Sequence, residues 1–532
     1  MSNGAGSAAL LREGGVSWNY RYQYLAGGVN TGQGWTTWNA NAEFASFYIK
    51  ESAENGLVPV FTYYQLLQSK PARGGGEDER DFNNLNNQDT MRAYYNEFRL
   101  LLEKAAATNQ TVIIHVEPDL AGYMQQRVVD STNSAASITA SVADTGLSDL
   151  KGLPNTYQGF NQALLRLRDR YAPKVLLATH ASAWSTKVDV STSTDPNLDV
   201  ASAGRKTAEF LGTAGIDASE VGVGRFDLIF VDASDRDAGF HQIINGDGGA
   251  HWWDDKNLKR PNFTTFNAYL QALTSRAGRK AFLWQVPIGN TIMRTENNAW
   301  NHFQDNRVQY WLGGYPTDYH LASLARSGVA AILWGRGADG NSSAEDAAQD
   351  GITNPPAING NNRVAVSADD DGGYLKERML AYQKSGQLQI NDLGGSPAKA
   401  PPSSATPVKT TPTAGSNVNT TTEVAASSPS NAAATLKIVV NIVKPGPYRI
   451  AFKASTDANA ATVRVDVDGA TIGAALSVPK RTAKKQQVTL TTTSAYMSKG
   501  RHSIAIVNVA GTTKVSGARV IYCATCPTSK AP

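Results

Sequence analysis

The strongest constraint on the fold is an alternation, before residue 390, of short apolar runs with amphipathic helical patterns. The apolar runs are rich in β-branched residues and too short for helices, which is typical of buried parallel strands. Strand, helix and strand at this spacing predict parallel β-α-β units. The expected strands, seven or eight in number, include 16–28, 58–66, 111–117, 174–184, 226–235, 280–289 and 329–335.

That number of strands predicts an α/β fold with a TIM-like β/α barrel, in a complete or a distorted seven-stranded form. An open doubly wound sheet is the alternative, but no Gly-rich phosphate-binding loop follows the first strand. Helices are expected between the strands, at 39–55, 87–107, 157–171, 203–213, 262–276, 319–327 and 373–384.

Composition divides the chain into three parts. Residues 394–433 are mostly Ser, Thr, Pro, Ala and Asn, which predicts a flexible linker. Residues 434–532 alternate apolar and polar positions in short runs separated by turn signals, which predicts an antiparallel β-sandwich. The expected domains are therefore a barrel at 1–393, the linker at 394–433 and the sandwich at 434–532.

The formal net charge of +4 argues against a nucleic-acid-binding function for the whole molecule. The charge is uneven, because residues 434–532 contain fourteen Lys and Arg against three Asp and Glu. No stretch is apolar enough to predict a membrane span. The first residues lack a basic segment followed by an apolar one. We expect a secreted protein whose signal peptide is absent from this sequence; an intracellular protein is the alternative.

Metal ligands are not evident in the sequence. Cys523 and Cys526 form a single Cys-x-x-Cys without a second pair, so a small terminal disulfide or an inert thiol pair is expected. His115 and Glu117 are two apart on a predicted strand and share one face, but no third ligand stands out. We therefore expect no metal and no cofactor.

Two carboxylates, Glu117 and Asp119, flank Pro118 where the strand at 111–117 should end. Pro118 has no N–H and restricts the residue before it, so strand pairing should stop there. In an α/β barrel the carboxyl ends of the strands carry the chemistry, and paired acids there suit general acid catalysis. The other interpretation is that one carboxylate caps the next helix and the other forms a salt bridge.

Other predicted strand ends also carry polar or aromatic side chains. The polar candidates for the site are Tyr64, His180, Asp232, Gln285 and Asp339. The tryptophans at or after strand ends are Trp35, Trp38, Trp184, Trp252, Trp253 and Trp334. Indole rings offer large apolar faces that suit stacking on sugar rings, although core or loop anchors are the alternative for each of them. A polar cleft edged by indoles is the expected arrangement.

A family resemblance supports this interpretation. Residues 116–120, Val-Glu-Pro-Asp-Leu, resemble the Glu-Pro-Asp strand end of family 6 glycoside hydrolases, the cellobiohydrolases and endoglucanases. Residues 177–184, Leu-Ala-Thr-His-Ala-Ser-Ala-Trp, are similar to that family's Asp-Ala-Gly-His-Ala-Gly-Trp strand. Residues 333–340 resemble its late segment, which ends in Glu-x-Asp-Gly. The order matches over residues 58–384, and the resemblance implies Asp119 as the general acid, Asp339 as the base and a distorted barrel.

The sequence also departs from this family. The family's Tyr-Asp-Leu, whose aspartate supports the acid, is here Tyr64-Gln65-Leu66. The late segment lacks the family's lysine and glutamate, so cellulase specificity does not carry over. A rival resemblance is the clan of retaining barrel glycosidases with Asn-Glu-Pro on one strand, but Val116 precedes Glu117 here. We therefore prefer Asp119 over Glu117 as the proton donor.

The expected function is a glycoside hydrolase that cleaves a β-linked, glucan-type polysaccharide with inversion. Asp119 is kept protonated by an apolar wall and by the charge of Glu117. Asp339 or Asp232 activates the water, and Tyr64 stabilises the oxocarbenium-like centre. The competing hypothesis is a non-catalytic glycan-binding or cell-envelope protein on a degenerate barrel. The sugar, the linkage, and endo or exo attack stay open.

The C-terminal sandwich looks like the carbohydrate-binding modules that accompany secreted glycosidases. Its few aromatic residues, Tyr448, Phe452, Tyr496 and Tyr522, argue against a platform for crystalline cellulose. Its basic excess favours an anionic glycan or cell-envelope polymer as the partner, and a solubilising spacer is the alternative. The whole protein is expected to be a monomer.

Overall fold

The computed structural model divides into two compact units, Met1–Pro401 and Pro402–Pro532. In the first unit it describes residues 14–389, apart from 132, 219–223, 336 and 339. In the second unit the described residues are 436–442, 446–456, 460–467, 470–471, 475–480, 488–492, 495–497, 500–510 and 513–522. The expected linker at 394–433 and Cys523 and Cys526 lie outside these ranges.

The first unit contains a seven-stranded parallel sheet in which the strands follow one another in sequence order. The strands are β1 (Tyr20–Leu25), β2 (Val58–Tyr63), β3 (Ile113–Val116), β4 (Leu176–His180), β5 (Leu228–Asp232), β6 (Lys280–Val286) and β7 (Val329–Trp334). The sheet curls into a barrel-like shape in which β1 and β7 come near each other. Within the described residues no hydrogen-bonded register joins these two strands. The prediction of seven parallel strands is confirmed, and the observed shape is a curled half-barrel.

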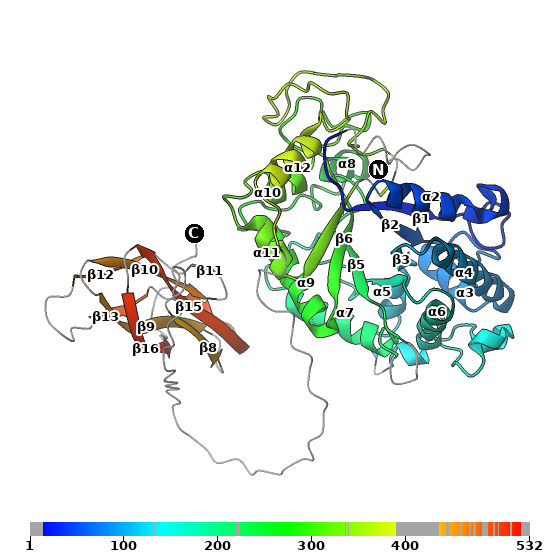
Figure 1. The fold of residues 1–532 in the computed structure, drawn as a ribbon, viewed down its shortest axis with the longest axis horizontal. Helices are drawn as coiled ribbons and strands as arrows, with labels where there is room; N and C mark the ends of the chain where they lie inside the picture. Colours follow the sequence, from blue (N-terminus) through cyan, green and yellow to red (C-terminus); the bar gives the residue numbers. More distant parts are fainter. Residues whose placement is uncertain are drawn as a thin grey trace, which may run out of the picture. The chain divides into compact units, whose positions relative to one another are not determined.

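Helices cover the outer side of this sheet (Figure 1). The predicted helices appear as α2 (Phe44–Glu54), α4 (Gln88–Thr108), α6 (Tyr157–Tyr171), α7 (Val200–Thr213), α9 (Phe263–Ala277), α11 (His320–Arg326) and α12 (Tyr374–Lys384). Several begin at a side-chain cap, as where Asn87 accepts a hydrogen bond from the Thr90 amide and Thr156 accepts one from the Gly159 amide. In the part of the chain that the structure describes, no helix combines the length and apolar character needed to cross a bilayer.

Some helices were not predicted. They are α3 (Glu77–Leu85), α5 (Leu120–Gln126), α8 (Ala238–Phe240), a π-helical turn η7 (His241–Asn245) and α10 (Arg307–Leu312). No helix was predicted for α3, because three glycines precede it and most of its residues are charged or polar. It is helical because one face of it is buried, including Asp81 and Leu85.

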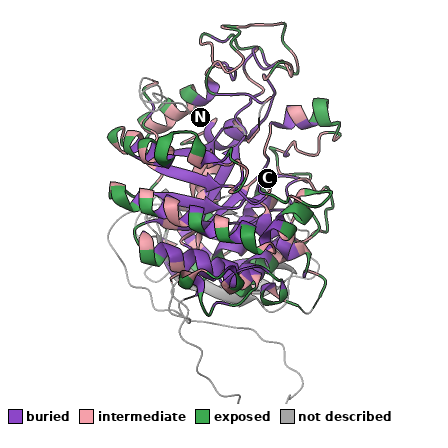
Figure 2. Cartoon of the chain, turned by 90° about the vertical axis from the view of Figure 1, so that its right-hand side faces the viewer, coloured by how far each residue is buried: buried purple, intermediate pink, exposed green. Residues whose placement is uncertain are grey.

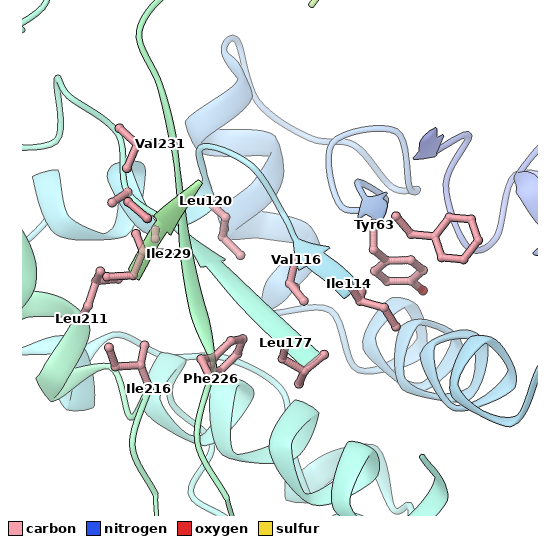
Figure 3. Packing of buried hydrophobic residues seen from close by; sticks show 14 of the residues in the cluster. Tyr63, Ile114, Val116, Leu120, Leu177, Leu211, Ile216, Phe226, Ile229 and Val231 are labelled. Carbon is pink, nitrogen blue, oxygen red and sulfur yellow. The ribbon is translucent and has the colours of Figure 1, made fainter. Parts of the chain in front are cut away.

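Two apolar layers hold the sheet in place. Along β3, Ile113 packs in the barrel interior with Phe230 and Trp284, whereas Ile114 packs under the helices with Leu177. This alternation is the period of two that a strand imposes on its side chains. Figure 3 shows Ile114 and Leu177 on the helix side, and Figure 2 shows buried residues through the sheet and exposed ones on the outer faces of the helices.

The second unit contains two antiparallel sheets, as expected from its alternating pattern. One sheet contains β8 (Leu436–Ile442), β10 (Ala461–Val467), β11 (Ala470–Thr471), β12 (Leu476–Val478) and β15 (Gly500–Ala510). The other contains β9 (Gly446–Thr456), β13 (Val488–Thr491), β14 (Ala495–Met497) and β16 (Thr513–Tyr522). Side chains of both sheets form one apolar core, which includes Ile450 and Phe452 of β9 and Val465 of β10. Phe452 is therefore a core residue.

Candidate active site

A cavity of about 340 Å³ opens at the carboxyl ends of the strands in the first unit. Five residues selected from the sequence line it, one from each of the ends of β2 to β6: Tyr64, Asp119, Trp184, Asp232 and Gln285. The other lining residues are Tyr24, Glu77, Pro118, Ala183, Asp189, Ser191, Ala233, Ser234, Asp235, His251, Trp284 and Gly337. Asp339, the predicted base, lies outside the described residues.

The Glu-Pro-Asp segment leaves β3 through a strained turn. Strand pairing ends where the amide of Glu117 donates to the carbonyl of Tyr63 at 2.8 Å. Glu117 has a φ of 40° and Asp119 a φ of 69°, so both residues lie in the left-handed region. Such backbone costs about 1–3 kcal/mol in a non-glycine residue and is concentrated at functional sites. The turn ends with Asp119 at the start of α5 and in the cavity wall.

Glu117 points away from this cavity, which corrects the expectation that it lies beside Asp119. Its carboxylate is buried and accepts hydrogen bonds from the amides of Gln65 (3.1 Å) and Leu66 (3.3 Å). Burial raises the pKa of Glu117 to about 8, although these amide hydrogen bonds act in the opposite direction. The left-handed turn breaks the strand alternation on which the expectation rested. Glu117 therefore positions the chain after β2.

Asp119 is surrounded by groups that act on its proton. Burial raises its pKa to about 7, and the charges of Asp232 and Glu77 act in the same direction. The charge of His180 and a 3.3 Å hydrogen bond from the Ser182 hydroxyl oppose this rise. An aspartate with such a pKa keeps a proton at mildly acidic pH and exchanges it near neutrality.

His180 lies beneath the two aspartates and does not line the cavity, so it is not placed to bind substrate as expected. Its Nε2 is 3.5 Å from Asp232 Oδ1 and 3.7 Å from Asp119 Oδ1. Burial lowers the pKa of His180, but its interactions with Asp232 and Asp119 outweigh burial, so the pKa is raised. An imidazolium at this place balances part of the negative charge of the aspartate pair.

A second buried histidine extends the network into the barrel interior. His115 Nε2 is 3.0 Å from His180 Nδ1, and His115 Nδ1 is 3.3 Å from the Thr62 hydroxyl. Burial, followed by the charge of His180, holds the pKa of His115 well below its usual value. A neutral His115 either accepts at Nε2 from the Nδ1–H of His180 or donates from Nε2 to His180 Nδ1, depending on its tautomer. A protonated His180 donates at Nδ1 and directs its Nε2–H toward the carboxylates.

Asp119, His180 and Asp232 also have metal-ligand spacing, since one ligand atom from each lies within 4.8 Å of the others. Among the described residues this is the group that meets that spacing. The pair considered from the sequence, His115 and Glu117, does not form a ligand group, because each side chain bonds to other residues. A ligating histidine must be neutral and present a lone pair to the ion. The pKa of His180 is raised by the two aspartates in spite of burial, so a proton competes with a metal ion for this site.

Glu77 of α3 lines the cavity, and it was missed in the sequence together with the buried Asp81 of the same helix. The Tyr64 hydroxyl donates to Glu77 Oε1 at 2.6 Å. Burial raises the pKa of Glu77, and burial together with the charges of Glu117, Glu77 and Asp119 raises that of Asp81 well above its usual value. Glu77 and Asp81 are four residues apart, a helical spacing that was the available signal. Gln65, at the position of the family's supporting aspartate, instead bonds the backbone of Gly28 and Leu25.

Asp235 lies in the same cavity wall, and its pKa is shifted in the direction opposite to that of Asp119. Burial acts to raise its pKa, but a hydrogen bond from His241 and the charge of Arg236 outweigh it, so the pKa is lowered. Asp235 forms an ion pair with Arg236, and its Oδ1 is 3.3 Å from His241 Nε2.

The Tyr24 hydroxyl donates to Gln285 at 2.8 Å. Burial and nearby acids raise the pKa of Tyr24 well above the usual value. The cavity thus joins an ionised carboxylate to neutral donors.

The tryptophans divide into two groups. Trp184 lines the cavity and packs against Tyr123, with ring centroids 4.8 Å apart. Trp284, which the sequence analysis did not select, lines it as well. Trp38 and Trp252 are outside the lining: Trp38 stands edge-on against Phe44, and the Trp252 indole donates to Gln242.

Trp35, Trp253 and Trp334 are buried, so the expectation that they bind substrate is corrected. The Trp35 indole donates to Glu97 at 2.8 Å, and the Trp253 indole donates to the Ser191 carbonyl at 2.7 Å. Trp334 packs against Trp311 and lines a different, mostly apolar cavity of about 660 Å³ beside β1 and β7. None of the acids discussed above lines that larger cavity.

No family model matches the chain, and no curated protein matches it. Solved structures similar to part of it include the C-terminal CBM6 of a marine laminarinase from Zobellia galactanivorans, with 18% identity, a TM-score of 0.15, and coverage of 16% of this chain and 71% of that one. A family 35 carbohydrate-binding module from Clostridium thermocellum has 17% identity, a TM-score of 0.15 and coverage of 16% and 68%. A Podospora anserina GH26-CBM35 β-(1,4)-mannanase has 13% identity, a TM-score of 0.15 and coverage of 17% and 20%. These similarities are too weak to carry an argument, and they leave the resemblance to family 6 glycoside hydrolases a hypothesis based on its motifs.

Proposed function

We propose that the first unit is a glycoside hydrolase that cleaves a polysaccharide by general acid catalysis, with Asp119 as the proton donor. The observation that carries this proposal is the Asp119 carboxyl group in the cavity wall, with a pKa raised to about 7 by burial. A proton donor for a glycosidic oxygen needs a raised pKa of this kind. The motif resemblance supports a β-linked polysaccharide as the substrate class and a secreted protein.

The reaction uses a second carboxylate that stays ionised. Asp119 protonates the glycosidic oxygen, and the bond from that oxygen to the anomeric carbon breaks. A water molecule adds to the anomeric carbon and gives its proton to a carboxylate on the other side of the sugar. Asp235 suits this role, because its pKa is lowered while that of Asp119 is raised. Opposite shifts in one cavity are the pattern of an acid and its ionised partner.

Asp232 has another role in this proposal. Its ligand oxygen lies within 4.8 Å of that of Asp119. Inverting enzymes hold their two carboxyl groups about 6.5–9.5 Å apart to admit water between them. Asp232 is too close for that, so it raises the pKa of Asp119 and fixes His180. Proton NMR of the first-formed product tests inversion, because the anomeric signal must be opposite to that of the substrate.

The experiment for the function is a panel of soluble polysaccharides with β-glucan, xylan, mannan, chitosan and alginate. Reducing ends should form with one of them, and Asp119→Asn should lose this activity. The second candidate function is a non-catalytic glycan-binding protein, favoured by Gln65 where the resembling family has an acid. Retardation in a polysaccharide gel without cleavage of any polymer would support that candidate and reject the hydrolase.

For the second unit we propose glycan binding through its basic surface. The support is the excess of fourteen basic over three acidic residues in 434–532. An anionic glycan or cell-envelope polymer is the chemical class that such a charge attracts. Binding to alginate beads at low salt, with release by added salt, tests it.

A further inference from the structure

Trp300 is the most exposed of the ten tryptophans, with 85% of its surface accessible. The next most exposed, Trp38, reaches 41%. A single exposed apolar side chain is ordinary in a folded protein and proves nothing alone. The backbone at Trp300 is unusual as well, because it has a positive φ.

Trp300 and Asn301 form the tip of a tight hairpin turn. The His302 amide donates to the Ala299 carbonyl at 2.9 Å across the turn. Trp300 has a φ of 50° and Asn301 a φ of 70°. Two consecutive central residues with positive φ are the feature of type I′ turns, which favour Asn, Asp and Gly at these positions. Asn301 follows that preference and Trp300 does not, so the indole is kept at a position that disfavours it.

The base of this turn is rigid. The Asn298 side chain accepts a hydrogen bond from the Gln304 amide at 2.8 Å. The Phe303 amide donates to the Ser342 hydroxyl at 2.9 Å, and His302 Nδ1 lies 2.7 Å from the Asp370 carbonyl. The hairpin is thus tied to two later segments of the chain. A fixed base presents the indole without a large loss of conformational entropy on binding.

The turn also contacts the segment after β7, one residue of which lines the acid cavity. A Cβ placed on Gly340 would be 3.8 Å from Asn301 Oδ1, so the turn contacts the loop that follows β7. Gly337 of the same loop lines the cavity, and a Cβ there would be 2.5 Å from Gln285 Oε1. This segment therefore lines the cavity at Gly337 and contacts the Trp300 turn at Gly340.

We infer that Trp300 is a stacking platform for a sugar ring of the polysaccharide, outside the cavity in which Asp119 acts. This inference rests on the proposed hydrolase function and adds a binding site beyond the cavity. A cavity of about 340 Å³ is at the small end for ligand sites, so a polymer chain must continue past its mouth. A flat, exposed indole on a turn that contacts the Gly340 end of the loop offers the apolar face that a sugar ring stacks on.

The test compares three variants on the polysaccharide that the wild-type protein cleaves fastest in the panel and on the trisaccharide of the same sugar. Trp300→Asn should lower kcat/KM on the polymer by roughly tenfold, the scale of losing an aromatic contact at a binding surface. It should leave the trisaccharide rate within about twofold, the expected limit for losing a contact that a short substrate does not reach. Its melting temperature should stay or rise, because Asn accepts positive φ.

Trp300→Tyr keeps an aromatic face at the same position and should restore most of the polymer activity. Asn301→Gly is the matched control, because it changes the same turn but keeps the indole, and it should behave as the wild type. If Trp300→Asn lowers kcat/KM equally on the polymer and the trisaccharide, or on neither of them, the inference that Trp300 is a stacking platform is wrong.

Two further measurements separate this inference from the hydrolase proposal. Retardation of the variants in a gel of the polysaccharide reads binding without turnover, and unchanged retardation of Trp300→Asn would reject the platform even in an active enzyme. If the wild type cleaves no glycan, the hydrolase proposal fails. The gel is then made with the polymer that retards the wild type most, and the same variants are compared in it. Loss of self-association in Trp300→Asn, seen by size-exclusion chromatography, would assign the indole to a contact between copies of the chain and overturn the inference.

Discussion

The carboxylates of Asp119 and Asp232 approach to within 4.8 Å of each other, and His180 Nε2 lies 3.7 Å from the first and 3.5 Å from the second. The negative charge of Asp232 at this distance disfavours ionisation of Asp119 and acts to raise its pKa, in addition to burial. His180 offsets part of their charge from below. The two neighbours of Asp119 therefore act on its pKa in opposite directions, and this opposition can be measured.

Asp232→Asn and His180→Gln should move the alkaline limb of the pH–rate profile in opposite directions. A general acid works while protonated, so activity is present below the pKa of Asp119, about 7, and is lost as the pH rises through it. Removing the Asp232 charge lowers this pKa, and removing the His180 charge raises it. A shift in the same direction for both variants would contradict the role assigned to the pair.

Glu117→Gln should change stability more than activity. The folded pKa of Glu117, about 8, is raised by burial above the unfolded value, so the folded state holds a proton that the unfolded state releases. Glu117 therefore favours unfolding as the pH rises from about 4.5 to 8, by about 1.4 kcal/mol per pH unit at most. The variant lacks this proton, and its free energy of unfolding should fall less between pH 5 and 8. Urea unfolding at pH 5 and pH 8 measures the free energy of unfolding of both proteins. The same change between the two pH values in the variant and the wild type would argue against a protonated Glu117.

Chelators should leave the activity unchanged. The only group with metal-ligand spacing in the described residues contains His180, whose pKa the two aspartates raise in spite of burial, so a proton competes with a metal ion for its Nε2. Dialysis against EDTA should therefore keep the rate of polymer cleavage within about twofold, far from the loss expected on removing a catalytic metal. Loss of activity that added zinc restores would show that His180 is a neutral ligand.

Separation of the chain near Ser404 should leave two folded parts. Residues 394–433 have too little apolar character to pack on either side, so each unit keeps its own core. The N-terminal piece should be soluble and active, and only the C-terminal piece should bind alginate in a salt-sensitive manner. A melting temperature of the N-terminal piece well below that of the full chain would place the boundary elsewhere.

The fold was predictable where a local pattern and the final packing agree. The run that forms β3 is rich in β-branched residues and buried on both faces, and α6 has a capping Thr156 and a helical period, so both were found. The helix α3 was missed because the glycines before it and its own charges are typical of a loop, and only tertiary burial of its inner face makes it a helix.

The site was predictable in its strand-end residues and less so in their directions. Asp119 and Asp232 lie in the cavity wall, as their positions after strands suggest. Glu117 turns away because its positive φ breaks the alternation, which no residue pattern reveals. Trp35 occupies a similar position after a strand and is buried, since a strand end does not determine which side a loop tryptophan packs on.

The most direct test of the account is kcat of Asp119→Asn on the cleaved polysaccharide, with Glu117→Gln as the control. The Asn side chain keeps the shape but has no proton to transfer, so kcat should fall by roughly 10²–10⁴-fold while gel retardation by the polymer persists. Glu117→Gln should keep a rate near the wild type. If Asp119→Asn stays active and Glu117→Gln is inactive, the proton donor is Glu117, and the assignment of Asp119 is wrong.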